Sequence, residues 1–341
     1  MGGESEGCRR LRGCGWGMER VAGGRVRAGR ETVAWGRARR RGKRRKRGNV
    51  LGLWFFRVAL RLFGLRRTYG LLYIVGLYYV LCDIALVSSV GPYVRRRFPG
   101  SGIVKQRLHI YRLLVSQGKQ LIDRYASVSG WQRFGIRVEG YDEFASLMRK
   151  SGKGAILLTS HQGNWQFAMT AISEVGRTVH LVMVPDDNPE LQEALYPRAK
   201  GGNVRIISPR QYLGGVVEIT NALKRGDVVS MMGDRRYGAP AVEVSFLGDG
   251  AWLPYGAFSV AAAMECPVVV LSASKVSMYE YMVDMRNILY PRYGGGVDKV
   301  RQLRPWVQEF ASLMEAFAAA HPYECFLFRD VWREEGDEAP M

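Results

Sequence analysis

Cysteine and histidine are scarce in this sequence, which has 5 Cys and 4 His among 341 residues. No two cysteines have the Cys-x2-Cys spacing that is typical of a structural zinc site, so the sequence predicts no metal centre. A scattered set of cysteines is typical of a reduced setting. Cys266 and Cys325 lie in apolar runs, where we expect buried thiols that act as small hydrophobic side chains.

Several motifs with a clear mechanism are also missing. Without a Gly-x-Ser-x-Gly turn, the chain is not expected to be a serine hydrolase. It has neither a P-loop nor a dinucleotide-binding fingerprint, and we expect it to need no cofactor. The part of the chain that is expected to fold contains no recognisable nucleic-acid-binding module, so no specific nucleic-acid partner is predicted.

Acidic residues are rare at the start of the chain. Residues 1–50 contain 4 Glu against 16 Lys and Arg, so 12 of the 19 net positive charges lie there. Residues 1–48 have few apolar side chains to bury and are expected to be disordered. Three interpretations stay open: a tail that binds anionic lipid or nucleic acid, a targeting peptide, or a reading frame that begins too far upstream.

Two apolar segments follow this basic tail. Residues 51–64 place Arg57 and Arg61 on one face of a helix, a pattern typical of a helix that lies in a membrane interface. Residues 69–90 are long enough to cross a bilayer and carry a single charge, Asp83. Positive residues flank both ends, which favours a helix that docks on the domain or lies in the inner leaflet, and a true span is the alternative.

Helices and strands alternate through the rest of the chain. Strands are predicted at 154–160, 179–185, 204–209, 228–234, 267–275 and, as an edge strand, 279–288. Helices are predicted at 164–176, 188–202, 213–226, 255–266 and 297–320, while residues 101–150 are expected to hold helices and one short strand. This order predicts an α/β fold with a mostly parallel sheet flanked by helices. The expected organisation is a membrane-associated helical segment at 49–98, one domain at 99–332 and a tail at 333–341.

The candidate chemistry lies where these strands end. His161 directly follows the strand at 154–160, and open α/β sheets bind ligands beyond the carboxyl ends of their strands. Gly163 allows a tight turn, and Asn164 is a good N-cap, so His161 is expected at the start of a helix. The partial positive charge there keeps an imidazole neutral, as a general base requires. A capped turn with an incidental histidine is the alternative.

The segment HQGNWQ, residues 161–166, resembles the His-x-Gly-Asn-Trp-Glu signature of the lipid A late acyltransferases. These enzymes are a branch of the lysophospholipid acyltransferase superfamily, whose mark is His-x4-Asp/Glu. Residues 231–238 (MMGDRRYG), the run 246–275 and residues 321–332 (HPYECFLFRDVW) are similar to three further segments of the family, in the same order. The resemblance covers about 50–332 and implies an acyltransferase-like fold.

The resemblance implies that an acyl chain moves from an acyl carrier protein or coenzyme A thioester to the hydroxyl of a lipid, such as a lipid A precursor. The expected setting is the cytoplasmic face of a bacterial inner membrane, whose lipids would be partners. His161 would take the hydroxyl proton, and a neighbouring acid would stabilise the imidazolium.

The sequence departs from the family pattern at that acid, because Gln166 stands in its place. A glutamine can fix the imidazole tautomer through its amide oxygen, yet losing the charge would cost ~1–2 kcal/mol, about ten- to thirtyfold in rate. Asp234 follows another strand on the same side of the predicted sheet and could serve as the acid. A catalytically weakened or inactive lipid-binding scaffold is therefore the alternative function.

The predicted site includes six substrate-binding residues beside the three catalytic ones, His161, Gln166 and Asp234. Arg235 is expected to face a phosphate or the phosphopantetheine of the donor, and a charged turn is the alternative. A second phosphate contact is predicted at Arg198, with a solvated arginine as the alternative, and an acyl groove is predicted where the helix at 255–266 begins. The six residues are Gly163, Asn164, Arg198, Arg235, Tyr255 and Gly256.

Overall fold

The computed structural model describes residues 50–172, 176–183, 204–210, 215–236, 238–296 and 298–333. The chain divides after Asn49 into two units, and all of the described residues belong to the second. The predicted tail at 1–48 and the predicted helix at 188–202 therefore lie outside the described residues.

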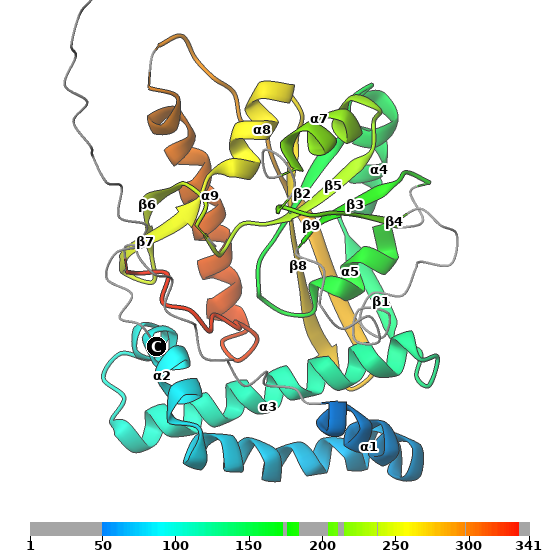
Figure 1. Cartoon of the computed structure of the whole chain (residues 1–341), viewed down its shortest axis with the longest axis vertical. Helices are drawn as coiled ribbons and strands as arrows, with labels where there is room; N and C mark the ends of the chain where they lie inside the picture. Colours follow the sequence, from blue (N-terminus) through cyan, green and yellow to red (C-terminus); the bar gives the residue numbers. More distant parts are fainter. Residues whose placement is uncertain are drawn as a thin grey trace, which may run out of the picture. The chain divides into compact units, whose positions relative to one another are not determined.

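The described strands form a seven-stranded sheet of order β1-β9-β8-β2-β5-β3-β4, shown in Figure 1. Neighbouring strands are parallel except for β8 and β9, which are antiparallel. The predicted mostly parallel sheet is confirmed. The strands are β1 (Gly135–Glu139), β2 (Ala155–Thr159), β3 (Val179–Val182), β4 (Val204–Ile207), β5 (Val228–Met232), β8 (Val268–Ser277) and β9 (Glu280–Leu289).

Helices cover both faces of this sheet, as the central strand β2 shows. Its side chains alternate between two separate hydrophobic clusters, so the strand is buried on each face. Ile156 and Leu158 pack in the cluster that includes residues of α7, α8 and α9, while Leu157 packs in the cluster that includes α4. These helices are α4 (Tyr141–Lys150), α5 (Trp165–Ile172), α7 (Val216–Lys224), α8 (Gly256–Met264) and α9 (Lys299–Ala320).

Two sequence predictions about strands are wrong or incomplete. The strand at 279–288 is not at the edge, because β1 pairs with β9 on its far side. A separate hairpin, β6 (Ala241–Phe246) and β7 (Asp249–Pro254), was not predicted. Its sequence did carry the signal, since buried and solvent-facing side chains alternate along β6 and a tight turn through Leu247 and Gly248 follows, both with positive φ.

The helices at the start of the described chain differ from the prediction at one point. The expected continuous helix at 69–90 is wrong, because α1 (Val50–Cys82) ends before Asp83 and α2 (Ile84–Arg97) begins after it. The Asp83 carboxylate accepts the N–H of Leu86 at 2.8 Å, so this charge caps a new helix instead of lying within one. Within the described residues no single helix combines the length and apolar character of a bilayer span. Together α1 and α2 have this length and apolar character, but the pair is bent by 95°.

The third helix of this region, α3 (Ile103–Val128), runs beside α1 along one side of the molecule (Figure 1). The contact is hydrophobic: Leu65 and Leu72 of α1 are buried in the same cluster as Ile122 and Ala126 of α3. The α1–α3 layer is therefore anchored by burial of apolar side chains.

Candidate active site

His161 and Asp234 are brought together by the register of two parallel strands. In the pairing of β2 with β5, Thr159 lies opposite Met232, and each strand end is followed two residues later by one of these side chains. The carboxyl ends of parallel strands share one edge of a sheet, so the two side chains emerge side by side. The proximity that the sequence predicted for Asp234 is confirmed, while its catalytic role stays a prediction.

The carboxylate of Asp234 accepts two hydrogen bonds from the same residue. Its Oδ2 lies 3.0 Å from the backbone nitrogen of His161, and both of its oxygens lie within 3.0 Å of the ring nitrogen Nδ1. The Asp234 side chain is fully buried, whereas 24% of the His161 side chain is exposed. One carboxylate therefore fixes both the backbone and the ring orientation of the histidine, and the ring keeps access to substrate.

Asp234 is held in its charged form by its surroundings. Burial by itself would raise the pKa of this carboxyl group, but the charge of His161 and the hydrogen bonds that its ring and backbone donate outweigh burial, and the nearby charge of Arg235 adds to them. The net result is a pKa below the ordinary value of the group. An ionised carboxylate against Nδ1 stabilises an imidazolium, as a general base requires once it has accepted a proton.

The loop that carries His161 is clamped by the C-terminal segment of the described chain. The N–H of Gly163 donates to the carbonyl of Glu324 at 2.7 Å, and the N–H of Phe326 donates to the carbonyl of His161 at 2.7 Å. Gln162, between these two positions, donates from its buried amide to the carbonyl of Met314 at 2.8 Å. The backbone around the histidine is therefore fixed on both of its edges.

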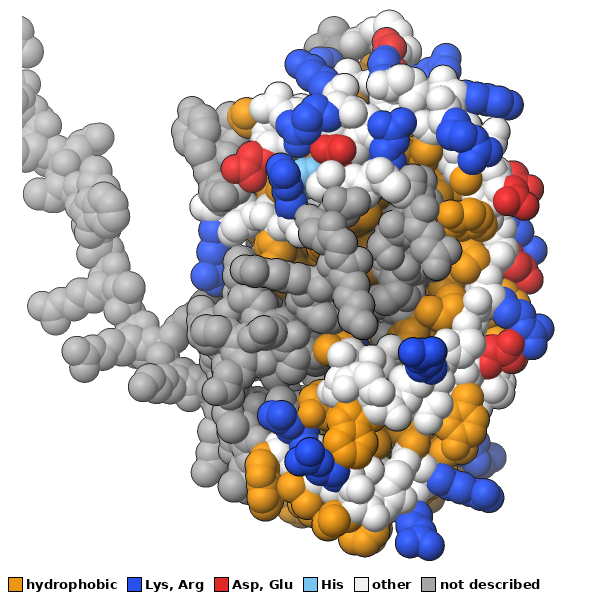
Figure 2. Space-filling model, turned by 90° about the vertical axis from the view of Figure 1, so that its right-hand side faces the viewer, with side chains coloured by type: hydrophobic (Ala, Val, Ile, Leu, Met, Phe, Trp, Pro, Cys, Tyr) orange, Lys and Arg blue, Asp and Glu red, His pale blue; other side chains and the backbone are white. Residues whose placement is uncertain are grey.

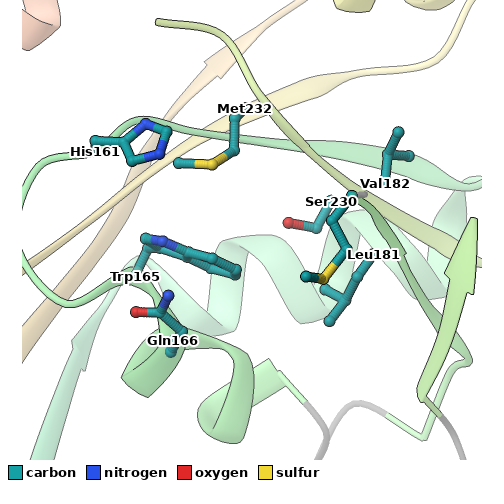
Figure 3. Close-up of a pocket in the computed structure, with 8 residues that line it drawn as sticks. His161, Trp165, Gln166, Leu181, Val182, Ser230 and Met232 are labelled. Atoms are coloured by element: carbon teal, nitrogen blue, oxygen red, sulfur yellow. The ribbon is translucent and has the colours of Figure 1, made fainter. Parts of the chain in front are cut away.

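A cavity of about 150 Å³ opens beside the His161 ring (Figure 3). Its walls come from the loop, from α5 and from the carboxyl ends of β3 and β5, and most of its lining is apolar. A small apolar cavity with a few polar groups is typical of a site for an acyl chain or another apolar ligand. The lining residues are His161, Trp165, Gln166, Leu181, Val182, Met183, Ser230 and Met232.

Gln166 belongs to this cavity and is not the partner of Nδ1, which faces Asp234. In the view of Figure 3 the Trp165 indole lies between the His161 ring and the Gln166 amide. The position that holds an acid in the resembled signature thus contributes a neutral amide to the cavity wall. The negative charge beside the histidine comes from the end of β5.

The other predicted binding residues have different surroundings. Gly163 and Asn164 are buried, and the Asn164 amide donates to the carbonyl of Gln120 at 3.1 Å. The Arg235 side chain donates to the carbonyl of Phe326 at 2.9 Å and lies 3.9 Å from Asp234. None of the predicted binding residues that the structure describes lines the cavity, since Gly163, Asn164, Arg235, Tyr255 and Gly256 are all absent from its lining. Arg198 lies outside the described residues.

Sequence reasoning missed the residues of β3 and β5 that line the cavity. Leu181, Val182, Met183, Ser230 and Met232 sit at the carboxyl ends of two predicted strands, so the rule that singled out His161 applied to them as well. Apart from the Ser230 hydroxyl they lack reactive groups, so their position is the main signal that could have identified them. Among the described residues no group of three or more His, Cys, Asp or Glu side chains is arranged to hold a metal ion.

Comparison with known proteins finds a matching family and similar solved structures. The model of a family described as bacterial lipid A biosynthesis acyltransferase matches residues 122–333. Among solved structures, the chain is similar to the crystal structure of the 1-acyl-sn-glycerophosphate (LPA) acyltransferase PlsC from Thermotoga maritima, with 14% identity over 75% of this chain and 98% of that chain. The TM-score is 0.36. The curated proteins contain no match.

Proposed function

Since the chain belongs to the bacterial lipid A biosynthesis acyltransferase family and is thus a lipid O-acyltransferase, we propose that it uses His161 as its general base. The donor would be a fatty acyl thioester of acyl carrier protein or coenzyme A, and the acceptor a hydroxyl of a lipid such as a lipid A precursor. One observation carries the proposal: the His161 ring stands at the cavity with its Nδ1 against the buried Asp234 carboxylate.

This arrangement assigns each nitrogen of the ring a task. Asp234 accepts the Nδ1–H, so Nε2 keeps the lone pair that can accept a proton. The acceptor hydroxyl gives its proton to Nε2 as its oxygen attacks the thioester carbonyl carbon. A C–O bond forms, the C–S bond breaks, and the imidazolium returns the proton to the departing sulfur. The products are a lipid ester and a free thiol.

Asp234 also bears on the alternative of an inactive scaffold. That alternative rested on Gln166, because a glutamine cannot supply the charge that an imidazolium needs. A buried carboxylate lies against the ring nitrogen Nδ1, and this supports catalysis by His161 without an acid at position 166. Gln166 would instead contribute to substrate binding, because it lines the cavity and its amide can both donate to and accept from a polar group.

We further propose that the chain works at a membrane surface, bound through an apolar face of its helical layer. Large apolar side chains of α1, α2 and the start of α3 are exposed there, and Figure 2 shows hydrophobic side chains gathered on the lower part of the molecule. An exposed patch of this kind marks an interaction site. We define this apolar face as Trp54, Phe55, Leu62, Phe63, Tyr73, Ile74, Leu77, Tyr78, Leu81, Ile84, Ile103, Val104 and Leu108.

Arginines on α1 accompany the apolar face. The guanidinium of Arg57 lies 5.7 Å from the centre of the Tyr125 ring, and that of Arg61 lies 5.4 Å from the centre of the Trp131 ring. Both arginines are exposed, as the sequence pattern predicted for an interfacial helix. Exposed cations beside exposed aromatic and aliphatic side chains favour an anionic lipid surface.

Changing three residues of the apolar face should release the protein from lipid vesicles. Ile74, Leu77 and Leu81 are 70%, 52% and 70% exposed, so glutamine at all three should not disturb the core. Burying one such side chain in lipid contributes about 1.5–3 kcal/mol, so we expect roughly a hundredfold or greater loss of vesicle partitioning. Co-flotation of the full chain with vesicles containing anionic lipid measures this loss. Changing Val216 and Val217 of α7 to glutamine is the control, and equal flotation of both variants would argue against this surface.

Acyl transfer itself is tested with membranes that contain the full chain. The membranes are incubated with a labelled fatty acyl thioester of acyl carrier protein or of coenzyme A, together with a total lipid extract. We expect label in a lipid whose mass increases by one acyl group, and membranes without the chain give the background. The favoured thioester identifies the donor, and the product mass identifies the acceptor. Absence of transfer from both donors would contradict the proposed function.

A further inference from the structure

A second cluster of polar and charged side chains lies next to the His161 loop. It joins α1, α3, β8, β9 and the segment that clamps the loop. Asp123 of α3 is fully buried and binds the ammonium group of Lys275 and the hydroxyl groups of Tyr69 and Tyr281. None of these groups lines the cavity or contacts the His161 ring. Burying a network of charged and polar groups costs desolvation free energy, so a network of this kind is a candidate for a functional role.

Glu324 connects this cluster with the active-site loop. Its carboxylate accepts the backbone N–H of Lys275 at 3.1 Å and the amide Nε2 of Gln120 at 2.8 Å. Its own backbone carbonyl accepts the N–H of Gly163. The side chain of Asn164, in turn, donates to the backbone carbonyl of Gln120. Glu324 is therefore connected to Gly163 through its own backbone and to Asn164 through Gln120, two and three residues after His161.

We propose that Glu324 is a positioning residue of the acyl transfer, whose carboxylate fixes the clamping segment and α3 against the loop and so sets the place of the His161 ring. The inference rests on the proposed function, because it concerns the residue that acts there as the base. Glu324 does not touch the cavity and acts only through the backbone of Gly163 and the side chain of Asn164.

The surroundings of Glu324 disfavour the charged form of its carboxyl group. Among the described residues it accepts hydrogen bonds only from uncharged donors, since the ammonium group of Lys275 is bound to Asp123 and to the carbonyl of Met278. Burial raises the pKa of Glu324 to about 7, against the attraction of Lys275 and with the repulsion of Asp123 in addition. From α1 and β9, Tyr69 and Tyr281 face the same cluster through Asp123. A residue retained at a cost in stability is a candidate for function.

The raised pKa of Glu324 determines how its contribution to stability changes with pH. The pKa of Glu324 is higher in the folded chain than its ordinary value of 4.5, so the folded state binds the proton more tightly. Its contribution is most favourable below pH 4.5 and is lost as the pH rises through about 7. Above pH 7 the fold holds a partly buried charge that a neutral amide would not carry.

The test is Glu324→Gln in the full chain, measured in the acyl-transfer assay and by thermal unfolding. We expect kcat to fall about ten- to hundredfold with little change in KM, because a base displaced by a fraction of an ångström still allows substrate to bind. The melting temperature at pH 8 should rise by about 2–4 °C, and this gain should vanish by pH 5, where the wild-type carboxyl group is protonated. Lower activity together with higher stability is a result that a merely structural residue would not give.

Two further variants complete the test. Asp298→Asn changes an acid that also accepts a backbone N–H, from Arg301 at 2.9 Å, but it lies at the start of α9 and should leave kcat unchanged. Gln120→Met removes the amide that binds Glu324 and keeps the backbone carbonyl that binds Asn164, and it should lower kcat in the same direction. Wild-type kcat in Glu324→Gln, or a loss of kcat accompanied by a lower melting temperature at pH 8, would overturn the inference. Neither result would affect the proposed function, which fails if neither donor supports transfer or if wild type and His161→Ala transfer acyl groups equally.

Discussion

Asp234→Asn should abolish most acyl transfer while the fold persists. The carboxylate accepts two N–H groups of His161, one from the backbone and one from the ring, and an asparagine has a single acceptor oxygen. If its NH₂ group faces the ring, Nδ1 must become the acceptor and the proton moves to Nε2, which can then no longer act as a base. In a serine-protease triad this exchange costs about 10⁴-fold in kcat, and we expect a loss of about 10³- to 10⁴-fold here.

His161→Ala should be at least as severe, and the two changes should not add. Residues that act as one unit give a double variant about as slow as the slower single variant. We therefore expect the double variant to match His161→Ala within about twofold in the transfer assay. A double variant much slower than both would mean that Asp234 acts on the substrate and not through the histidine.

The chain contains a matched control for this experiment. His180 and Asp227 form a second, partly buried pair, with Nε2 and Oδ2 3.0 Å apart. Asp227 directly precedes β5 and Asp234 follows it, so the two pairs lie at opposite edges of the same sheet. Asp227→Asn should leave transfer near the wild-type level. Substantial activity in Asp234→Asn, or an equal loss in Asp227→Asn, would remove the evidence for a specific dyad.

The contribution of the Asp234 carboxylate to folding stability should be lost at low pH. Folding lowers the pKa of Asp234 below its ordinary value of 3.8, so the unfolded chain binds the proton more tightly. The carboxylate therefore contributes its stabilisation above pH 3.8, and this contribution is lost as the pH falls through the folded pKa. Thermal unfolding should show Asp234→Asn to be less stable than wild type at pH 7 and closer to it in strong acid.

The fold was largely predictable because its strands are buried on both faces. Continuous apolar runs such as β2, separated by amphipathic helices, leave few arrangements other than a mostly parallel sheet. One error fell where a single residue decides between two local structures. Asp83 interrupts an apolar segment that composition alone assigns to a single helix, and only the hydrogen bond to the N–H of Leu86 shows that it starts a new one.

The candidate site was predictable in part for a similar reason. His161 and Asp234 both follow predicted strands, so topology alone places them at one edge of the sheet. The side chain that faces Nδ1 is determined by strand register. The resembled signature places an acid at position 166, which is nearer in sequence and is occupied by glutamine here. The clamp by Glu324 and Phe326 was beyond sequence reasoning, because it joins two segments more than 160 residues apart through backbone groups that any residue type carries.

Gly163→Ala should inactivate and destabilise the protein, because no side chain fits at this position. A Cβ atom on residue 163 would lie 1.7 Å from the carbonyl oxygen of Ala273, and the residue has a φ of +57°. The backbone cannot retreat easily, since that same oxygen accepts the N–H of Asn164 at 2.8 Å and the N–H of Gly163 is held by Glu324. We expect a loss of about 3 kcal/mol or more from overpacking and backbone strain together, a fall of roughly 6–12 °C in melting temperature.

Gly130→Ala separates the strain from the clash. Gly130 has a φ of +71°, close to that of Gly163, but nothing lies within 4 Å of the added Cβ atom. Its replacement should therefore cost only the conformational strain, about 1 kcal/mol, and transfer should remain near the wild-type level. If Gly163→Ala behaved like Gly130→Ala in both measurements, the loop would have room to move away from β8. The rigid backbone that holds His161 against Asp234 would then not be a requirement of the reaction.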